Sequence, residues 1–255
     1  NSLFIHRLQP DGWGLFPEHW NGLWGRIFRL STRMDINGLQ ISTERLLSLI
    51  FPACCRLCGT AVHPHEHLCP ACMDDLPWLK SSCPRCSLPL PAAAGDVPCG
   101  RCQQQPPDFD NTLALFHYQP PVDYLLKRLK FSGELALCPF FSRLLTERIG
   151  TRAGPLPELI LPVPLHHTRL RERGFNQSTE LARRLGHALD VRVDYRLCSR
   201  IRSTHPQSLL PRAERRRNMR GAFKTRRTPA AVHIAIVDDV MTTGHTCGEL
   251  ARTLK

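Results

Sequence analysis

Four C-x-x-C pairs constrain the fold of this chain more than any other feature of its sequence. Each pair can form a tight turn whose two thiolates face one ion, and two such turns complete the tetrahedral sulfur shell that Zn²⁺ prefers. The spacing favours sequential pairing, the first pair with the second and the third with the fourth, although an interleaved pairing also satisfies it. The ligands predicted for two structural zinc ions are Cys55, Cys58, Cys69, Cys72, Cys83, Cys86, Cys99 and Cys102.

The alternative for these cysteines is a set of redox-active or unliganded thiols. A closed shell of four thiolates leaves no position for water, so a catalytic zinc is not expected. Cys54 lies one residue too far from Cys58 to form a C-x-x-C pair. His63, His65 and His67 lie between the first two pairs and fit a solvated loop better than a ligand set.

The cysteines also bear on the compartment. Clustered C-x-x-C pairs in a reducing compartment indicate metal binding, whereas scattered cysteines in a secreted chain indicate disulfides. No apolar run approaches the ~20 residues that a membrane span needs, and the N-terminus lacks a signal-peptide pattern. We therefore expect a cytoplasmic protein with no membrane span. The chain begins with Asn1 and ends at Lys255 inside a helical pattern, which is typical of a fragment.

The positive charge of the chain is confined to one segment. The whole chain has a net charge of +12, and residues 166–227 alone contain 17 basic and 5 acidic residues. The rest of the chain is therefore balanced. A solvated basic surface would explain this excess, and so would contact with an anionic ligand, either phosphates or nucleic acid.

Three segments differ in their residue pattern. Residues 1–50 are weakly patterned and are expected to be an N-terminal extension that ends in a short apolar helix over Thr43–Phe51. Residues 51–105 contain the cysteine pairs, and Gln103–Asp110, with its two prolines, is typical of a linker. Residues 110–255 alternate between strand-like and helix-like patterns, which predicts an α/β domain with a parallel sheet flanked by helices.

Within this last segment the elements follow each other in a regular order. Strands are predicted over residues 112–118, 159–163 and 233–237, and helices over residues 122–131, 135–149, 178–189 and from about 247. The stretch between 166 and 177 is polar and basic and is expected to be a loop. Lys127, Arg128 and Lys130 lie at the end of the first helix, where they could balance the helix dipole or contact an anion.

Two adjacent acids follow the last apolar strand. Asp238 and Asp239 come directly before M-T-T-G-H-T, where a turn and a helix N-terminus can present amide and hydroxyl donors to a phosphate. The acids accept hydrogen bonds when ionised, so they suit sugar hydroxyls or magnesium-bound water and not the phosphate itself. A sugar phosphate is therefore the predicted ligand. The candidate phosphate-binding residues are Met241, Thr242, Thr243, Gly244, His245 and Thr246.

These residues resemble a known family. I-V-D-D-V-M-T-T-G-H-T is similar to the phosphoribosyl pyrophosphate (PRPP) motif of type I phosphoribosyltransferases. P-V-P-L at residues 162–165, R-G-F-N-Q at 173–177 and K-R-L-K-F-S-G at 127–133 resemble the competence protein F (ComF) family within that superfamily. Its N-terminal double zinc ribbon matches the cysteine pairs. Gln207, Arg212, Arg215 and Asn218 also match its pattern.

The resemblance implies a phosphoribosyltransferase-like domain over residues 110–255 that binds PRPP with Mg²⁺. It implies that Asp238 and Asp239 are catalytic, holding the ribose hydroxyls as pyrophosphate leaves through an oxocarbenium-like transition state. Arg169, Arg171 and Arg173 are expected near the pyrophosphate, and residues 200–217 correspond to a mobile flap. Such folds continue with a further helix and strand, so the domain is expected to be incomplete at its C-terminus.

Several functions remain open at this stage. The first is transfer of a phosphoribosyl group to an unidentified acceptor in connection with DNA uptake or utilisation, a role that the resemblance implies. The second is a nucleic-acid-binding accessory factor with a non-catalytic PRPP fold, whose partners would include single-stranded DNA and the DNA-uptake machinery. The third is a PRPP-sensing regulator. Fold and motif alone do not decide among them.

Overall fold

The computed structural model describes residues 2–8, 33–36, 39–42, 53–152, 154–203 and 217–255. The chain forms two compact units, one of Gly12–Asp75 and one of Asn1–Asp11 with Leu76–Lys255. The boundary between the units lies inside the range 51–105, so the first and second sets of four cysteines belong to different units. The helix predicted over Thr43–Phe51 lies outside the described residues.

The smaller unit contains an antiparallel pair of strands and the first set of cysteines. Strands β2 (Arg33–Ile36) and β3 (Leu39–Ser42) pair with each other. Helix α2 (Pro70–Asp74) begins after Cys69, whose sulfur accepts a hydrogen bond from the amide of Cys72 at 3.5 Å. This contact fixes the turn of the second C-x-x-C pair and orients both of its thiols.

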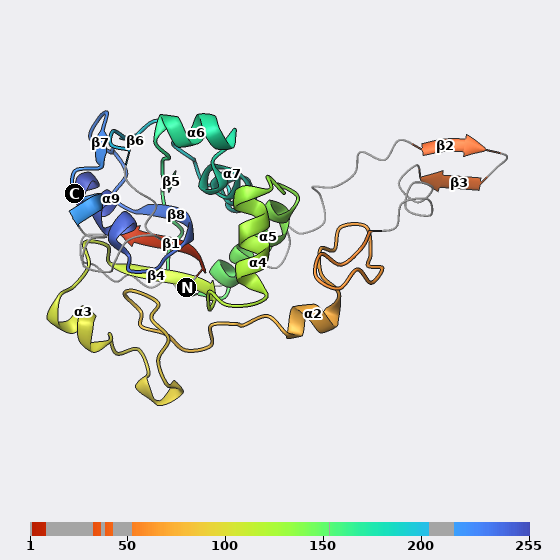
Figure 1. The fold of residues 1–255 in the computed structure, drawn as a ribbon, viewed down its shortest axis with the longest axis horizontal. Helices are drawn as coiled ribbons and strands as arrows, with labels where there is room; N and C mark the ends of the chain where they lie inside the picture. Colours follow the sequence, from red (N-terminus) through yellow and green to blue (C-terminus); the bar gives the residue numbers. More distant parts are fainter. Residues whose placement is uncertain (1, 9–32, 37–38, 43–52, 153, 204–216) are drawn as a thin grey trace. The chain divides into compact units, whose positions relative to one another are not determined.

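The larger unit is built on a four-stranded sheet in the order β4-β1-β8-β5 (Figure 1). These strands are β4 (Asn111–Phe116), β1 (Ser2–Leu8), β8 (Ile234–Val240) and β5 (Leu159–Pro162). Strands β5 and β8 are parallel, as predicted, whereas β1 is antiparallel to both β4 and β8. The sheet is therefore mixed, and the weak pattern of residues 1–50 did not indicate that Ser2–Leu8 belongs to it.

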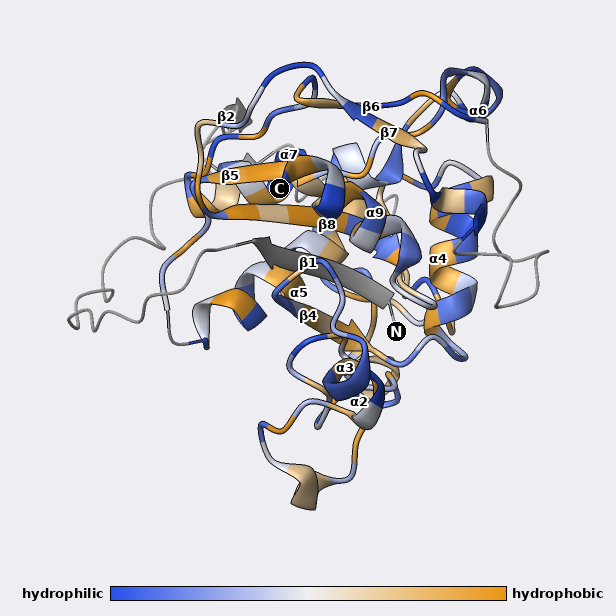
Figure 2. Cartoon of the chain, turned by 90° about the vertical axis from the view of Figure 1, so that its left-hand side faces the viewer, coloured by the Kyte–Doolittle hydropathy of each residue, from blue (hydrophilic) through white to orange (hydrophobic). Residues whose placement is uncertain are grey.

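Strand β8 ends three residues beyond Val237, the predicted end of the apolar run. Its residues from Ile234 to Asp239 are all buried, which suits a strand in the middle of a sheet. Hydropathy colouring shows β5 and β8 as apolar strands inside the unit (Figure 2). Pairing with β1 continues through Asp238, which lies opposite Phe4, and through Val240, which lies opposite Ser2. The two acids consequently lie within the strand and not in the loop after it.

Helices cover the sheet close to the predicted positions. Helix α7 packs against both β5 and β8, and α5 packs against α7. Apolar residues at helical spacing form the buried face of α4, which consists of Val122, Leu125, Leu126 and Leu129, as their spacing predicts. The helices are α4 (Val122–Phe131), α5 (Leu137–Gly150), α7 (Gln177–Leu189) and α9 (His245–Leu254).

The basic stretch between β5 and α7 is not entirely a loop, as the sequence had suggested. It contains the short helix α6 (His167–Arg173), which ends at Gly174 with φ of 80°. At the start of α6, the ring of His166 hydrogen-bonds the Thr168 hydroxyl at 2.8 Å. A helix of 7 residues is too short to show an apolar period, which explains why the pattern did not reveal it.

The second set of cysteines belongs to the core of the larger unit. All four are buried in one cluster with apolar residues of β5, β8 and α9. This region contains the 3₁₀ turn η1 (Ala92–Ala94) and helix α3 (Gly100–Gln104). The antiparallel pair of β6 (Cys198–Arg200) and β7 (Phe223–Thr225) contributes Cys198 and Phe223 to the same cluster.

Candidate functional site

Two groups of four cysteines have the geometry of zinc sites. In each group the four sulfur atoms lie within 4.8 Å of one another. The Cys58–Cys69 and Cys86–Cys99 sulfur pairs are each 3.7 Å apart, close to the ~3.8 Å edge of a tetrahedron with Zn–S bonds of ~2.3 Å. The groups are Cys55, Cys58, Cys69, Cys72 and Cys83, Cys86, Cys99, Cys102. The favoured sequential pairing is thus confirmed, and both groups fit structural zinc.

The neighbouring candidates do not join these groups. In the described part of the chain, neither Cys54 nor His63, His65 and His67 belongs to a metal-ligand cluster. His63 and His65 are exposed, in agreement with a solvated loop. Burial alone would raise the pKa of the Cys55 thiol, but hydrogen bonds from nearby backbone amides lower it to about 6. That thiol is therefore prepared to ionise when a cation binds.

The two acids at the end of β8 are buried and held by neighbours from three helices. Asp238 is 8% exposed and Asp239 is 3% exposed. The hydroxyl of Ser178, in the first turn of α7, donates to Oδ1 of Asp238 at 3.2 Å. Lys130 Nζ, at the end of α4, lies 3.3 Å from Oδ2 of Asp239. On α9, the sulfur of Cys247 lies 3.9 Å from Oδ2 of Asp238.

The surroundings shift the pKa values of the two acids in opposite directions. Burial, followed by the negative charge of Asp239, raises the pKa of Asp238 to about 7. Burial would also raise the pKa of Asp239, but the Lys130 ammonium and hydrogen bonds from Asp238 and Gln177 outweigh it and lower that pKa. At neutral pH the pair therefore combines one ionised carboxylate with one carboxyl group that is close to its midpoint.

The predicted phosphate loop joins β8 to α9. Gly244 is the N-cap of α9 and has φ of 76°, a conformation that a side chain would strain. A Cβ atom at this position would lie 3.3 Å from the ring of Phe109. Thr242 is exposed, whereas Thr243 is buried, and no described group hydrogen-bonds its hydroxyl oxygen. The loop thus combines a helix N-terminus with the buried hydroxyl of Thr243, which could hydrogen-bond a ligand.

Among the predicted arginines, Arg173 is close enough to Asp239 for their charges to interact. Its guanidinium donates to Oε1 of Gln177 at 2.7 Å and lies 5.8 Å from the ring centre of Phe131. Burial lowers the pKa of Arg173, and the charge of Asp239 opposes that shift. The structure therefore brings Arg173 and Lys130 to the same acid pair.

The other two predicted arginines differ from Arg173. The positive charge of Arg169 contributes to lowering the pKa of Arg173 and of Arg200. The charges of these three arginines therefore interact. Arg171 is exposed. Of the further residues matched to the family pattern, Gln207, Arg212 and Arg215 lie outside the described residues.

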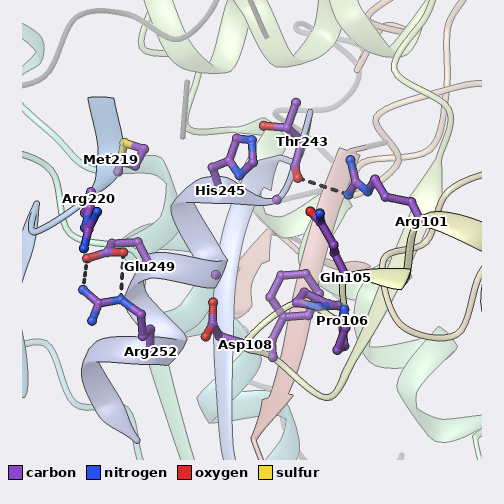
Figure 3. Close-up of a pocket in the computed structure, with 14 residues that line it drawn as sticks. Arg101, Gln105, Pro106, Asp108, Met219, Arg220, Thr243, His245, Glu249 and Arg252 are labelled. Atoms are coloured by element: carbon purple, nitrogen blue, oxygen red, sulfur yellow. Dashed lines mark hydrogen bonds and ion pairs between the residues drawn. The ribbon is translucent and has the colours of Figure 1, made fainter. Parts of the chain in front are cut away.

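A cavity of about 520 Å³ is lined in part by Thr243, Gly244 and His245 of the predicted phosphate loop. Its walls come from the second zinc-binding region, from α9 and from the residues that precede β7, and neither Asp238 nor Asp239 lines it. Figure 3 shows Glu249 paired with Arg252 in its wall, at 2.6 Å. Figure 3 also shows the Arg101 guanidinium pointing to the Thr243 carbonyl, to which it donates at 3.3 Å.

Sequence reasoning missed residues that position the site. Ser178 contacts Asp238 because Asn176 caps α7: its side chain accepts from the amide of Ser178 at 3.0 Å and donates to the carbonyl of Val163 at 3.0 Å. An Asn directly before an amphipathic helix could have indicated this cap. Phe109 lies in the predicted linker yet is only 1% exposed, and no local pattern distinguished it from a linker residue.

No helix in the described ranges is both long and apolar enough to cross a lipid bilayer.

Comparison with known proteins identifies the N-terminal metal-binding region. The family model described as "Double zinc ribbon domain" matches residues 46–103. This range includes both groups of cysteines. No solved structure matches the chain.

Similar curated proteins cover most of the chain. The DNA utilization protein YhgH of Salmonella typhi is 36% identical over 211 residues, covering 81% of this chain and 92% of that protein. Competence protein F of Haemophilus influenzae is 34% identical over 164 residues, covering 62% of this chain and 72% of that protein. Competence protein ComFC of Bacillus subtilis is 27% identical over 205 residues, covering 75% and 79%.

The match to YhgH covers 81% of this chain, in agreement with the resemblance found in the motifs. The chain belongs to the family of competence protein F and the DNA utilization protein YhgH.

Proposed function

We propose that this protein binds PRPP as its magnesium complex and acts as a phosphoribosyltransferase-type protein in DNA uptake or utilisation. One observation carries the proposal: two buried acids, Asp238 and Asp239, end a central strand directly before a loop and helix N-terminus suited to a phosphate. The role in DNA uptake or utilisation is supported by the names of relatives at up to 36% identity.

The two parts of the site suit the two parts of a sugar phosphate. Asp239, whose pKa is lowered, would accept hydrogen bonds from the ribose hydroxyls, and Asp238 would join it once ionised. The 5′-phosphate would lie at the start of α9, where Gly244 lets the backbone approach and the helix dipole favours an anion. The hydroxyl of Thr243 would then gain a hydrogen-bond partner.

The cations beside the acids suit the other end of PRPP. Arg173, together with Arg169 and Arg171 on α6, would stabilise the charge that develops on the leaving pyrophosphate. Lys130 keeps Asp239 ionised, so negative charge would remain near the sugar carbon as its bond to pyrophosphate breaks. Magnesium would enter with the substrate and carry part of the pyrophosphate charge.

A nucleic-acid-binding accessory role is the second candidate, favoured by the net charge of +12 that lies within residues 166–227. In this alternative the PRPP site is non-catalytic or regulatory. Single-stranded DNA would bind the basic segment through its phosphates, and affinity would fall steeply with salt. Titration with a single-stranded oligonucleotide at two salt concentrations measures this directly.

The binding proposal is tested by calorimetric titration with PRPP and Mg²⁺. The double variant Asp238→Ala with Asp239→Ala should lose binding yet keep about two zinc ions per chain, as two closed shells require. Asp74→Ala with Asp75→Ala is a matched control, because it removes another adjacent pair of acids, both exposed and in the other unit. Unchanged PRPP affinity in the Asp238 and Asp239 double variant would refute the site.

Catalysis is tested separately from binding. An acceptor screen with pyrophosphate release as its readout should find turnover with some acceptor if the protein is a transferase. PRPP binding without pyrophosphate release from any acceptor would favour the regulatory alternative over the enzyme.

A further inference from the structure

The second zinc-binding region contacts the backbone of the phosphate loop through a single arginine. Arg101 lies between two of the zinc ligands, Cys99 and Cys102, in helix α3. Its Nη2 donates to the carbonyl oxygen of Thr243 at 3.3 Å, a bond drawn in Figure 3. Arg101 is therefore held in the chain between two zinc ligands, and its side chain reaches the carbonyl of the residue directly before Gly244.

A second contact joins the same two regions a few residues further along. Phe109 is 1% exposed, and its ring lies 3.3 Å from where a Cβ atom of Gly244 would be. Asp108 Oδ2 lies 3.8 Å from the corresponding Cβ position of Gly248 on α9. The chain that leaves the second zinc-binding region thus runs along the loop and the first turns of α9.

The core shows the same connection on a larger scale. The four cysteines of the second set share one buried cluster with Met241 of the loop and with Cys247 and Leu250 of α9. Packed cores transmit displacements because they contain few voids. A loop supported in this way keeps its amides oriented before any ligand arrives, which is what a preorganised anion site requires.

We propose that the second zinc-binding region positions the phosphate loop and that Arg101 is the positioning residue, acting through the Thr243 carbonyl. Zinc at this site would then determine ligand affinity without touching the ligand. The part of this inference that concerns affinity rests on the proposed PRPP function, whereas the part that concerns loop order does not.

The chain contains a matched control for Arg101. Arg85 occupies the same place in its C-x-x-C pair, directly before Cys86, as Arg101 does before Cys102. Both arginines directly precede a cysteine of the second zinc site. Each substitution therefore removes one positive charge next to a zinc-binding cysteine. Only Arg101 bonds Thr243.

The first experiment measures hydrogen–deuterium exchange in the ligand-free, zinc-loaded protein. Arg101→Ala should raise the exchange rate of the peptide covering residues 241–248 by about tenfold, the change expected when one hydrogen bond to a charged group is lost. Arg101→Lys should restore part of the protection, and Arg85→Ala should match the wild type. Zinc content should stay at about two per chain in all variants.

The second experiment measures PRPP–Mg²⁺ affinity by calorimetry with the same variants. We expect about tenfold weaker binding for Arg101→Ala and wild-type binding for Arg85→Ala. Equal exchange and equal affinity in the Arg101→Ala and Arg85→Ala proteins would overturn the positioning role. If the wild type itself fails to bind PRPP, the proposed function fails, and the exchange result still decides whether Arg101 orders the loop.

Discussion

At the scale of single residues, the unusual feature is a pair of neighbouring acids with opposite protonation behaviour. Burial and the charge of Asp239 raise the pKa of Asp238 to about 7, while Lys130 helps to lower the pKa of Asp239. The sequence predicted the two acids as site residues, but it could not predict this division. The division depends on Lys130 and Ser178, which lie 109 and 60 residues away in the chain.

The raised pKa of Asp238 predicts how stability varies with pH. Its folded pKa of about 7 exceeds the usual ~3.9 of an unfolded Asp. The native state therefore holds more protons between about pH 4 and 7, and this contribution to stability is lost as pH rises through the folded pKa. Asp238→Asn, which imitates the protonated form, should gain stability relative to the wild type as pH rises from about 4 to about 7, and the gain should level off above the folded pKa.

Urea denaturation at pH 5, 6, 7 and 8 measures this difference, which should increase from pH 5 to pH 7 and change little between pH 7 and pH 8. Each unit of pKa shift corresponds to ~1.4 kcal/mol. The exposed Asp96 provides a control, since Asp96→Asn should follow the wild type at every pH. A difference between Asp238→Asn and wild type that stays constant with pH would contradict the assignment.

At the scale of elements, the sequence predicted most of what local pattern determines. The buried face of α4 followed from apolar spacing, and the parallel arrangement of β5 and β8 followed from the alternation of strands and helices. The helix α6 and the extension of β8 through Asp238 did not. The first has too few residues to show a period, and the second depends on pairing with β1, which is a contact distant in sequence.

The connection from β8 to α9 contains Gly244, whose conformation and surroundings leave no room for a side chain. Gly244→Ala should destabilise the protein by ~1–3 kcal/mol, because it places a Cβ in a left-handed conformation and against Phe109. Gly174→Ala is the matched control, because Gly174 has a similar backbone conformation, with φ of 80° and ψ of −15° against 76° and 3° at Gly244. Nothing lies within 4 Å of a Cβ added at Gly174, so this variant reports the conformational cost alone. Chemical denaturation of the two variants should show the larger loss for Gly244→Ala.

At the scale of the whole molecule, two zinc sites serve two separate compact units. The second set of cysteines is buried in the core of the unit that contains β8 and α9, whereas the first set belongs to Gly12–Asp75. The cysteine spacing predicted both sites and favoured the sequential pairing that the structure shows, although an interleaved pairing also satisfied it. It could not predict that one of them shares a core with the candidate ligand site, because that depends on tertiary packing around Phe109.

This division predicts unequal effects of losing each metal. Cys99→Ser, in the second set, should expose the peptide of β8 to hydrogen exchange, because the metal and the core stabilise each other. Cys58→Ser, in the first set, should lower zinc content equally but leave exchange in β8 unchanged. Equal protection of β8 in the two variants would show that the second site does not support the sheet.

The thiol of Cys247 has a consequence of its own. It is buried on α9 beside Asp238, and burial followed by the nearby negative charges raises its pKa well above the ordinary value. A neutral, covered thiol is unreactive, so an alkylating reagent can reach it only when α9 separates from the strand. The labelling rate of Cys247 would therefore report how often α9 separates from β8 at the candidate ligand site.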